Sequence, residues 1–348
     1  MNKHGGYFGE NRKDILDFSV NVNPLGASDK LYDHIKKNLK SIITYPEIDG
    51  ESHKKMLSNH LNIKDNNIIL GNGATELIYL FARATKPQRV LIIEPTFTEY
   101  KRGFRLAGSD IFSYISEEIN DFKINKDTLL NKINKLKPDV VVLCNPNNPT
   151  GIFTNKNDIK PILNKINDIN SYLFVDESFI DFVDKESYIE LIDKNNLFIL
   201  RSMTKFYAIP GLRLGYGLGG SKLINKLNEN KEPWTLNSLA LNSLEIILKD
   251  NEYMDKTLDW YNREKKFLWK ELNNIKNIKV FYGEANFFLI KLKELEGQEL
   301  KKLLIEEDIY IRTCEDFDGL DKSYIRTTIR SHNENVKLIE TLKKILGE

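Results

Sequence analysis

Residues 140–151 read Val-Val-Val-Leu-Cys-Asn-Pro-Asn-Asn-Pro-Thr-Gly, an unbroken apolar run that ends abruptly in a loop rich in Asn and Pro. A run without polar alternation predicts a strand buried on both faces, which is typical of parallel sheets covered by helices. The loop marks the carboxyl end of that strand. This stretch therefore predicts an α/β fold, with a loop at the edge of the sheet where ligands bind in such folds.

Other short apolar runs with the same texture lie on both sides of this one. Segments with helical periodicity separate them, and polar or glycine-rich residues follow nearly every run. Apolar strands that alternate with crossover helices predict a mostly parallel sheet with helices on both faces, so the polar strand ends should meet in one cleft. The runs are residues 67–70, 90–93, 172–175 and 197–200, and the helical segments between them include 75–84, 129–136 and 159–166.

The chain changes character after about residue 235, where long charged helical sequence replaces the alternating pattern. Its elements predict a smaller α+β domain. They are a helical region at 239–275, strands at 280–282, 287–290 and 324–326, and a helix at 300–306. We therefore expect an N-terminal arm that joins the small domain (1–40), a large domain (41–238) and a small C-terminal domain (239–348).

The composition limits the possible functions. The 348 residues include 51 Lys and Arg against 50 Asp and Glu, a formal net charge of +1, so no overall field favours nucleic acid or an anionic membrane as a partner. No apolar run approaches a membrane span, and the N-terminus lacks the apolar stretch of a signal peptide. Two widely separated cysteines, Cys144 and Cys314, indicate a reducing compartment. We expect a cytoplasmic protein without a metal site.

Three features at the predicted strand ends carry possible chemistry, and each has an ordinary alternative. Residues 71–75, Gly-Asn-Gly-Ala-Thr, open a helix and could bind an anion through backbone N–H groups, or could simply form a tight turn. Asp176 could be a functional carboxylate or a cap of the next turn. Lys205 could be a reactive amine or a solvated surface lysine.

Together these features resemble a known family. Residues 202–205, Ser-Met-Thr-Lys, followed by Arg213, are similar to the lysine signature of fold-type I pyridoxal-phosphate enzymes, the class I/II aminotransferase family. The loop at 145–151 and the placement of Asp176 ahead of the lysine match the same family, and the resemblance extends from Asn21 to Arg330. It implies a large domain with a mostly parallel sheet, a smaller α+β domain, and pyridoxal 5'-phosphate as cofactor.

The resemblance implies roles for individual residues. Lys205 is expected to attach to the cofactor and to move protons at the substrate α-carbon, tasks that suit a partly desolvated amine. Asp176 is expected beside the pyridine nitrogen, Asn148 at the ring 3-oxygen and Phe97 against the ring face. The phosphate donors implied are Gly73, Ala74, Thr75, Ser202, Thr204 and Arg213, with Tyr45 reaching in from a second subunit of a homodimer with shared active sites.

Two branches of this family resemble the chain most, the threonine-phosphate decarboxylases and the histidinol-phosphate aminotransferases. Both take a small phosphorylated amino acid or amine. Phe179 occupies a position where the aminotransferases usually carry a tyrosine, and residues 201–211 carry a proline before the last glycine, as the decarboxylases do. The N-terminal run beginning at His4 and residues 17–26 also resemble the decarboxylases.

The decarboxylase resemblance implies a set of substrate-binding residues in the arm and near the C-terminus. For His4 a frayed tail is the alternative, and for Arg330 a surface salt bridge. The set is His4, Asn23, Leu25, Gly26, Asn148, Arg326 and Arg330. Further candidates whose distance from the site the sequence leaves open are Arg12, Asn21, Arg102 and Arg105.

The expected activity is therefore decarboxylation of a phosphorylated amino acid, with histidinol-phosphate transamination as the alternative. A third possibility is a regulatory protein that binds the cofactor without catalysis. Such regulators carry a DNA-binding domain ahead of this fold, whereas the match here already begins near His4.

Overall fold

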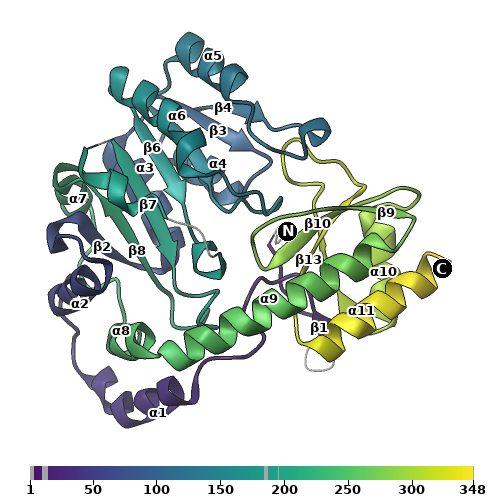
Figure 1. Cartoon of the computed structure of the whole chain (residues 1–348). Helices are drawn as coiled ribbons and strands as arrows, with labels where there is room; N and C mark the ends of the chain where they lie inside the picture. Colours follow the sequence, from purple (N-terminus) through teal and green to yellow (C-terminus); the bar gives the residue numbers. More distant parts are fainter. Residues whose placement is uncertain (1–3, 10–14, 184–186, 195, 348) are drawn as a thin grey trace.

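A seven-stranded sheet forms the centre of the larger part of the molecule (Figure 1). This computed structural model describes residues 4–9, 15–183, 187–194 and 196–347. The strands lie in the order β2-β8-β7-β6-β5-β3-β4, and β8 alone of these runs antiparallel to its neighbours. They are β2 (Ile68–Asn72), β3 (Arg89–Glu94), β4 (Asp110–Ile115), β5 (Val140–Cys144), β6 (Tyr172–Asp176), β7 (Leu197–Ser202) and β8 (Leu214–Gly219).

Successive side chains of the central strands enter two different cores. Val141 of β5 packs with helices α5 and α6, whereas Val140 and Val142 pack with α3, α4 and α7 on the opposite face. This alternation is the pleat of a strand buried on both sides, and it confirms the prediction from residues 140–151. The helices are α3 (Gly73–Thr85), α4 (Thr98–Leu106), α5 (Lys126–Leu136), α6 (Lys156–Asp168) and α7 (Ser221–Asn228).

Strand β8 has no counterpart among the predicted strands. Its sequence, Leu-Gly-Tyr-Gly-Leu-Gly, lacks the bulky alternation that signals a strand. The glycines are required by close packing: a Cβ at Gly217 would lie 2.4 Å from the ring of Phe198 on β7. The glycines that let this strand pack closely against its neighbours therefore also weaken the sequence pattern that would predict it.

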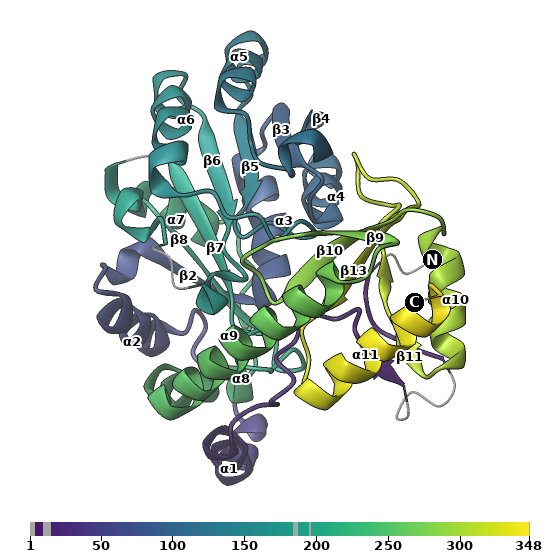
Figure 2. The ribbon, with the colours of Figure 1, turned by 45° about the vertical axis from the view of Figure 1, so that its right-hand side comes forward.

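A four-stranded antiparallel sheet, β12-β13-β10-β9, forms the centre of the smaller part (Figure 2). Helix α9 runs along this part and packs against β9 and α11. The long helical region expected at 239–275 is divided at Asp250, whose carboxylate caps α9 by accepting a bond from the Tyr253 N–H. The elements are α8 (Ser238–Lys249), α9 (Asn251–Asn273), β9 (Ile278–Phe281), β10 (Phe287–Leu292), α10 (Gly297–Glu306), β12 (Arg312–Thr313), β13 (Tyr324–Thr328) and α11 (His332–Ile345).

The N-terminal segment belongs to both parts. Its strand β1 (Leu16–Asp17) pairs in parallel with β11 (Ile309–Tyr310) of the smaller part, and the Thr328 N–H donates to the Phe18 carbonyl. Further along, α1 (Asp29–Asn38) packs on α8, and α2 (Glu51–Leu61) packs on both α8 and β2. Short 3-10 helices cover Leu39–Ile43, Asp65–Asn67, Glu118–Asn120, Ile180–Phe182 and Ile189–Lys194.

The parts are in direct contact at several points of the described chain, including the following two. The Glu118 carboxylate, after β4, accepts bonds from the Lys291 Nζ and the Tyr324 hydroxyl of the small sheet, each at 2.7 Å. Elsewhere the backbones of Gly151 and Gly283 touch, so that a Cβ on Gly151 would lie 2.8 Å from the Gly283 Cα. The two parts are therefore packed against each other at both ends of the junction.

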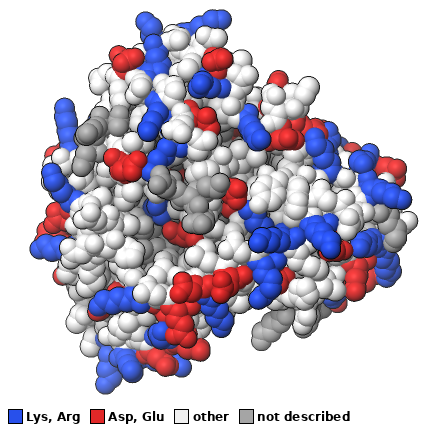
Figure 3. Space-filling model, in the orientation of Figure 1, with Lys and Arg blue, Asp and Glu red and all other residues white. Residues whose placement is uncertain are grey.

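On the face shown in Figure 3, basic and acidic side chains are intermingled, in keeping with the balanced composition. Among the described residues, no helix has the length and apolarity needed to cross a bilayer.

Candidate active site

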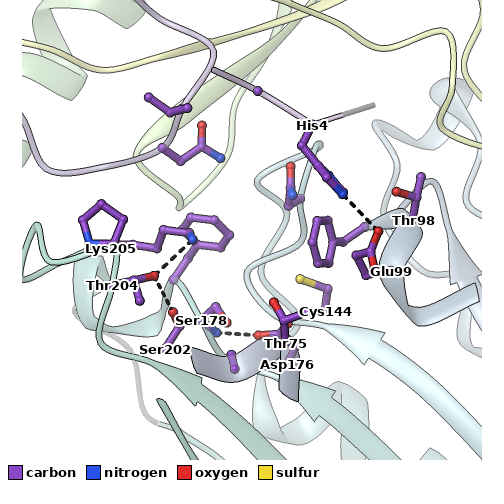
Figure 4. Close-up of a pocket in the computed structure, with 18 of the residues that line it drawn as sticks. His4, Thr75, Thr98, Glu99, Cys144, Asp176, Ser178, Ser202, Thr204 and Lys205 are labelled. Atoms are coloured by element: carbon purple, nitrogen blue, oxygen red, sulfur yellow. Dashed lines mark hydrogen bonds and ion pairs between the residues drawn. The ribbon is translucent and has the colours of Figure 1, made fainter. Parts of the chain in front are cut away.

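A cavity of about 440 Å³ lies beyond the carboxyl ends of β5, β6 and β7, between the two parts of the molecule (Figure 4). This is the edge of the sheet where the polar strand ends were predicted to meet. The predicted site residues that line it are His4, Ala74, Thr75, Phe97, Asn148, Asp176, Ser202, Thr204, Lys205, Arg213 and Arg326. The structure thus brings together residues from the arm, the large part and the small part.

Lys205 projects into the cavity from the turn after β7. Its Nζ donates to the Thr204 hydroxyl at 3.2 Å, and that hydroxyl lies 2.9 Å from the Ser202 hydroxyl. Burial and the nearby Arg213 guanidinium lower the pKa of Lys205 to about 8. Near neutral pH the amine is therefore mostly protonated, with about a tenth of it uncharged, so both the nucleophilic and the proton-carrying form are accessible.

Asp176 ends β6 and is buried. Its carboxylate accepts a bond from the Ser178 N–H at 2.8 Å and another from the Tyr100 hydroxyl at 2.6 Å. Burial raises the pKa of Asp176, and the bonds from Ser178 and Tyr100, which act to lower this pKa, do not outweigh the burial. A protonated pyridine nitrogen would supply the missing positive partner, so this carboxylate fits the expected cofactor.

The turn before α3 fits the cofactor phosphate. Gly73 has a φ of +75°, and a Cβ there would lie 2.3 Å from the Arg213 guanidinium. Glycine therefore lets the guanidinium approach the first turn of the helix, where Ala74 and Thr75 also line the cavity. Ser202, the last residue of β7, and Thr204, in the turn that follows, add hydroxyl groups to the cavity lining. Hydroxyls, a guanidinium and a helix N-terminus are the donors that a dianion requires.

The small part contributes an arginine, Arg326, to the cavity lining. Arg326 of β13 is 5% exposed, and its two terminal nitrogens donate to the Asn148 side-chain oxygen at 2.5 Å and the Ser19 carbonyl at 2.6 Å. Its Nε is buried without a hydrogen-bond partner among the described residues. Burial lowers the pKa of Arg326 to about 10. An unpaired guanidinium N–H in a cavity is suited to an anionic ligand.

Arg312 is a lining residue that the sequence did not single out. It pairs in register with Arg326 across β12 and β13, and it also forms an ion pair with Asp316 at 2.7 Å. Because β12 has only two residues, it leaves no strand pattern in the sequence from which the position of Arg312 could be predicted. Two arginines therefore face the cavity from neighbouring strands.

Arg330, which was predicted to bind the substrate, is not among the residues that line the cavity. Its guanidinium donates to the Glu334 carboxylate at 2.6 Å and to the Asp17 carbonyl at 2.9 Å. Glu334 also caps the N-terminus of α11. The structure thus favours the salt-bridge alternative for this residue.

Asn23, Leu25 and Gly26, which were also predicted to bind the substrate, do not line the cavity either. The Asn23 amide donates to the Phe206 carbonyl and to two hydroxyls of α9, and the Gly26 carbonyl accepts from one of them. Leu25 packs against the main core. These residues anchor the segment, whereas Asn21 lines the cavity and has a side-chain oxygen that is buried without a partner among the described residues.

Other predicted residues lie elsewhere. Tyr45 is 84% exposed and packs beside Trp234, away from the cavity. Arg102 lies 3.5 Å from Glu99 but is not among the lining residues, and neither is Arg105. Arg12 falls outside the described residues. Glu99 and Tyr100 line the cavity although their sequence positions gave no signal beyond their place after Phe97. The described residues contain no cluster of three or more His, Cys, Asp or Glu that could hold a metal ion.

Comparison with known proteins agrees with this geometry. The family model for aminotransferase class I and II matches residues 13–342. The chain is 34% identical to the threonine-phosphate decarboxylase of Salmonella typhimurium, over 95% of this chain and 91% of that one.

Two solved structures are similar over their whole length. The histidinol-phosphate aminotransferase from Clostridium acetobutylicum has a TM-score of 0.90 and 34% identity, covering 96% of this chain and 99% of that one. The L-threonine-O-3-phosphate decarboxylase from Porphyromonas gingivalis has a TM-score of 0.85 and 30% identity, covering 95% and 99%. With its lysine, its buried aspartate and its phosphate cradle in one cavity, this chain belongs to the class I and II aminotransferase family of pyridoxal-phosphate-dependent enzymes.

Proposed function

We propose that this enzyme decarboxylates O-phospho-L-threonine to (R)-1-amino-2-propanol O-2-phosphate, a step of cobalamin biosynthesis. The observation that carries the proposal is the pair Arg312 and Arg326, side by side on β12 and β13 at the wall of the cavity. The substrate has a carboxylate on its α-carbon and a phosphate ester on the hydroxyl oxygen of its β-carbon. Two neighbouring guanidinium groups suit two such closely spaced anions.

The chain's residues divide the work of the reaction. When bound, the cofactor ring takes up the electron pair of the bond that breaks at the α-carbon. Asp176, held by Tyr100 and Ser178, stabilises positive charge on the ring nitrogen. The carboxyl group would leave as CO₂, and the protonated Lys205 amine would then deliver its proton to the α-carbon, where the electron pair returns to form the new C–H bond. A pKa of about 8 lets that amine carry the proton at neutral pH.

Substrate orientation selects which bond breaks. The bond held perpendicular to the cofactor ring is the one whose electrons the ring can accept. Arg326 is anchored by the Ser19 carbonyl and the Asn148 side chain, so it can fix a substrate carboxylate in one direction. Phe179 lines the same cavity and packs edge-on against Phe287 at 5.1 Å. A phenyl group there offers no hydroxyl for the cofactor oxygen and leaves Asn148 as its expected partner.

The competing function is histidinol-phosphate transamination, which the similarity to the Clostridium acetobutylicum enzyme favours. The two activities are separated by assaying the purified enzyme with pyridoxal phosphate. Phosphothreonine should yield CO₂ and the aminopropanol phosphate, identified by mass spectrometry. Conversion of histidinol phosphate with 2-oxoglutarate, with phosphothreonine untouched, would establish the aminotransferase instead.

A homodimer with shared active sites is part of this proposal. Large apolar side chains are exposed together around Tyr45, with Ile43 83% and Trp234 45% exposed. A second copy would bury them and bring Tyr45 to the partner's cofactor phosphate. Light scattering should give twice the monomer mass. Tyr45→Phe should weaken pyridoxal phosphate binding about 10-fold, and an unchanged affinity would remove Tyr45 from the site.

A further inference from the structure

A buried carboxylate lies in the wall of a cavity that otherwise suits anions. Among the described lining residues, the acidic ones are Asp176 and Glu99. Asp176 is accounted for by the cofactor ring, but Glu99 lies in the first turn of α4, at the opposite side of the cavity from Lys205 (Figure 4). It is 7% exposed. A negative charge there would repel a phosphorylated substrate unless another group covers it.

Arg102 of the same helix lies 3.5 Å from one Glu99 carboxylate oxygen, and the N-terminal arm supplies a group at the other oxygen. The His4 Nε2 lies 3.0 Å from one Glu99 carboxylate oxygen, and the Tyr79 hydroxyl donates to the other. The His4 ring also packs near Phe97, with centroids 5.7 Å apart. Glu99 therefore connects the arm to α3 and α4, the helices that begin at the cofactor side of the cavity.

Backbone donors and a ring contact hold the next residues of the arm, where the Tyr7 ring packs edge-on against Tyr310 of the small part with centroids 5.1 Å apart. The Gly6 N–H donates to the Ser19 hydroxyl at 2.7 Å, and the Tyr7 N–H donates to the Asp17 carboxylate at 2.9 Å. These two backbone bonds attach residues 6 and 7 to the arm's own segment around β1, which pairs with the small part, whereas the contact of His4 with Glu99 attaches the arm to the large part. His4 is therefore the arm's side-chain link across the cavity.

We propose that Glu99 is a positioning residue that docks His4, so that the arm replaces a carboxylate with an imidazole at the cavity wall and thereby makes the wall receptive to a phosphorylated substrate. The proposal rests on the proposed function for the identity of the substrate. Docking and anion binding are then coupled: the same contact that fixes the arm caps the carboxylate oxygen that would oppose the substrate.

The coupling predicts a reversal of sign in a double-mutant cycle. In the wild-type background, Glu99→Gln weakens the charged contact to His4 and should raise the dissociation constant of phosphothreonine about 5-fold. His4→Ala uncovers the carboxylate and should raise it about 10-fold or more. Added to His4→Ala, Glu99→Gln removes the uncovered charge and should lower the dissociation constant instead. A purely structural role for Glu99 would add a second loss.

The experiment uses the holoenzyme and two readouts. Phosphothreonine binding is followed by the change in cofactor absorbance, and arm docking by hydrogen exchange of the N-terminal peptide without substrate. Both His4→Ala and Glu99→Ala should accelerate exchange at Gly6 and Tyr7. Glu307→Gln, which removes a surface ion pair with Lys344, is the matched control and should change neither readout.

The outcomes separate the two proposals. Faster exchange in the Glu99 and His4 variants together with the sign reversal supports the docking role. Unchanged exchange in Glu99→Ala, or a further loss of affinity in the double variant, overturns it. If the wild-type enzyme does not bind phosphothreonine at all, the proposed substrate is wrong. The docking role is then decided by the hydrogen-exchange data, together with the same double-mutant cycle measured with inorganic phosphate as the anion.

Discussion

The two sides of the cavity are built in different ways. The cofactor side, formed by Asp176, Ser202, Thr204, Lys205 and Arg213, comes from strand ends and turns of a single sheet. The substrate side, formed by His4, Asn21, Arg312 and Arg326, comes from the two ends of the chain. The first is fixed by local structure, whereas the second depends on how the arm and the small sheet pack. Under the proposed function, the sheet would therefore set the chemistry, and the packing of distant segments would set the choice of substrate.

Removal of the amine on the cofactor side should have the largest effect. Lys205→Ala should lower CO₂ release by about 10³-fold or more, because both covalent attachment and proton delivery are lost. The visible absorbance of the lysine-bound cofactor should disappear, while Asp176 and the phosphate cradle still bind the cofactor. Thermal unfolding serves as the folding control. Activity within tenfold of wild type would show that another group moves the proton.

On the substrate side, Arg326→Lys should cost about 100-fold in kcat/KM. A lysine cannot hold Asn148, the Ser19 carbonyl and a carboxylate at the same time, because it lacks the planar fork of donors. Cofactor affinity, measured by titration of the apoenzyme, should remain within about twofold, since the cofactor phosphate is bound by the other side. An equal loss of cofactor affinity would mean that the two sides are not independent.

Arg312→Ala and Arg330→Ala form a matched pair that tests the assignment of the second arginine. Arg312→Ala should lower kcat/KM about 30-fold, chiefly through KM, because it removes a guanidinium from the cavity wall. Arg330→Ala should leave kcat/KM within about twofold and destabilise the protein by ~1 kcal/mol, through loss of the Glu334 pair. The reverse order of effects on kcat/KM would restore Arg330 to the site.

The smallest expected effect concerns the contact of Glu118 with Lys291 and Tyr324, which joins the large and small parts of the molecule. Burial acts to raise the pKa of Glu118, but bonds from Lys291 and Tyr324 outweigh it and hold this pKa at about 2. A carboxylate whose pKa is lower in the folded state stabilises the protein at pH values above its unfolded-state pKa. This stabilisation is lost as the pH falls toward 2.

Glu118→Gln should therefore destabilise the protein by ~1 kcal/mol at neutral pH, a value reduced for the partial exposure of the group. The difference from wild type should shrink between about pH 4.5 and pH 2. Urea unfolding at several pH values measures it. A difference that does not change with pH would place the stabilisation in packing rather than in the ion pairs.

The sequence predicted the cofactor side well because its determinants are local. A buried strand is visible as an apolar run, and the residue after it lies at the same sheet edge wherever the strand is parallel. Lys205, Asp176 and the turn at Gly73 therefore fell into one cleft as expected. Strand β8 escaped because its glycines, needed for contact with Phe198, weaken the strand pattern.

The substrate side was predicted only in part. Arg326 lies on a strand long enough to recognise, whereas Arg312 lies on a two-residue strand whose position is set by pairing with β13. Arg330 looked equivalent in sequence, but the start of α11 turns it toward Glu334. In the arm, the extended segment places Asn21 at the cavity and Asn23 against α9, a difference of register that the sequence does not reveal.

The contact between Gly151 and Gly283 has a mechanical consequence. The Glu284 N–H donates to the Gly151 carbonyl at 2.6 Å, so the junction there is backbone against backbone. The spacing of the two parts at this point is therefore set by main-chain atoms alone. A methyl group on Gly151 or Gly283 would lie within 2.8 Å of the opposite Cα, so either substitution would force the two backbones apart.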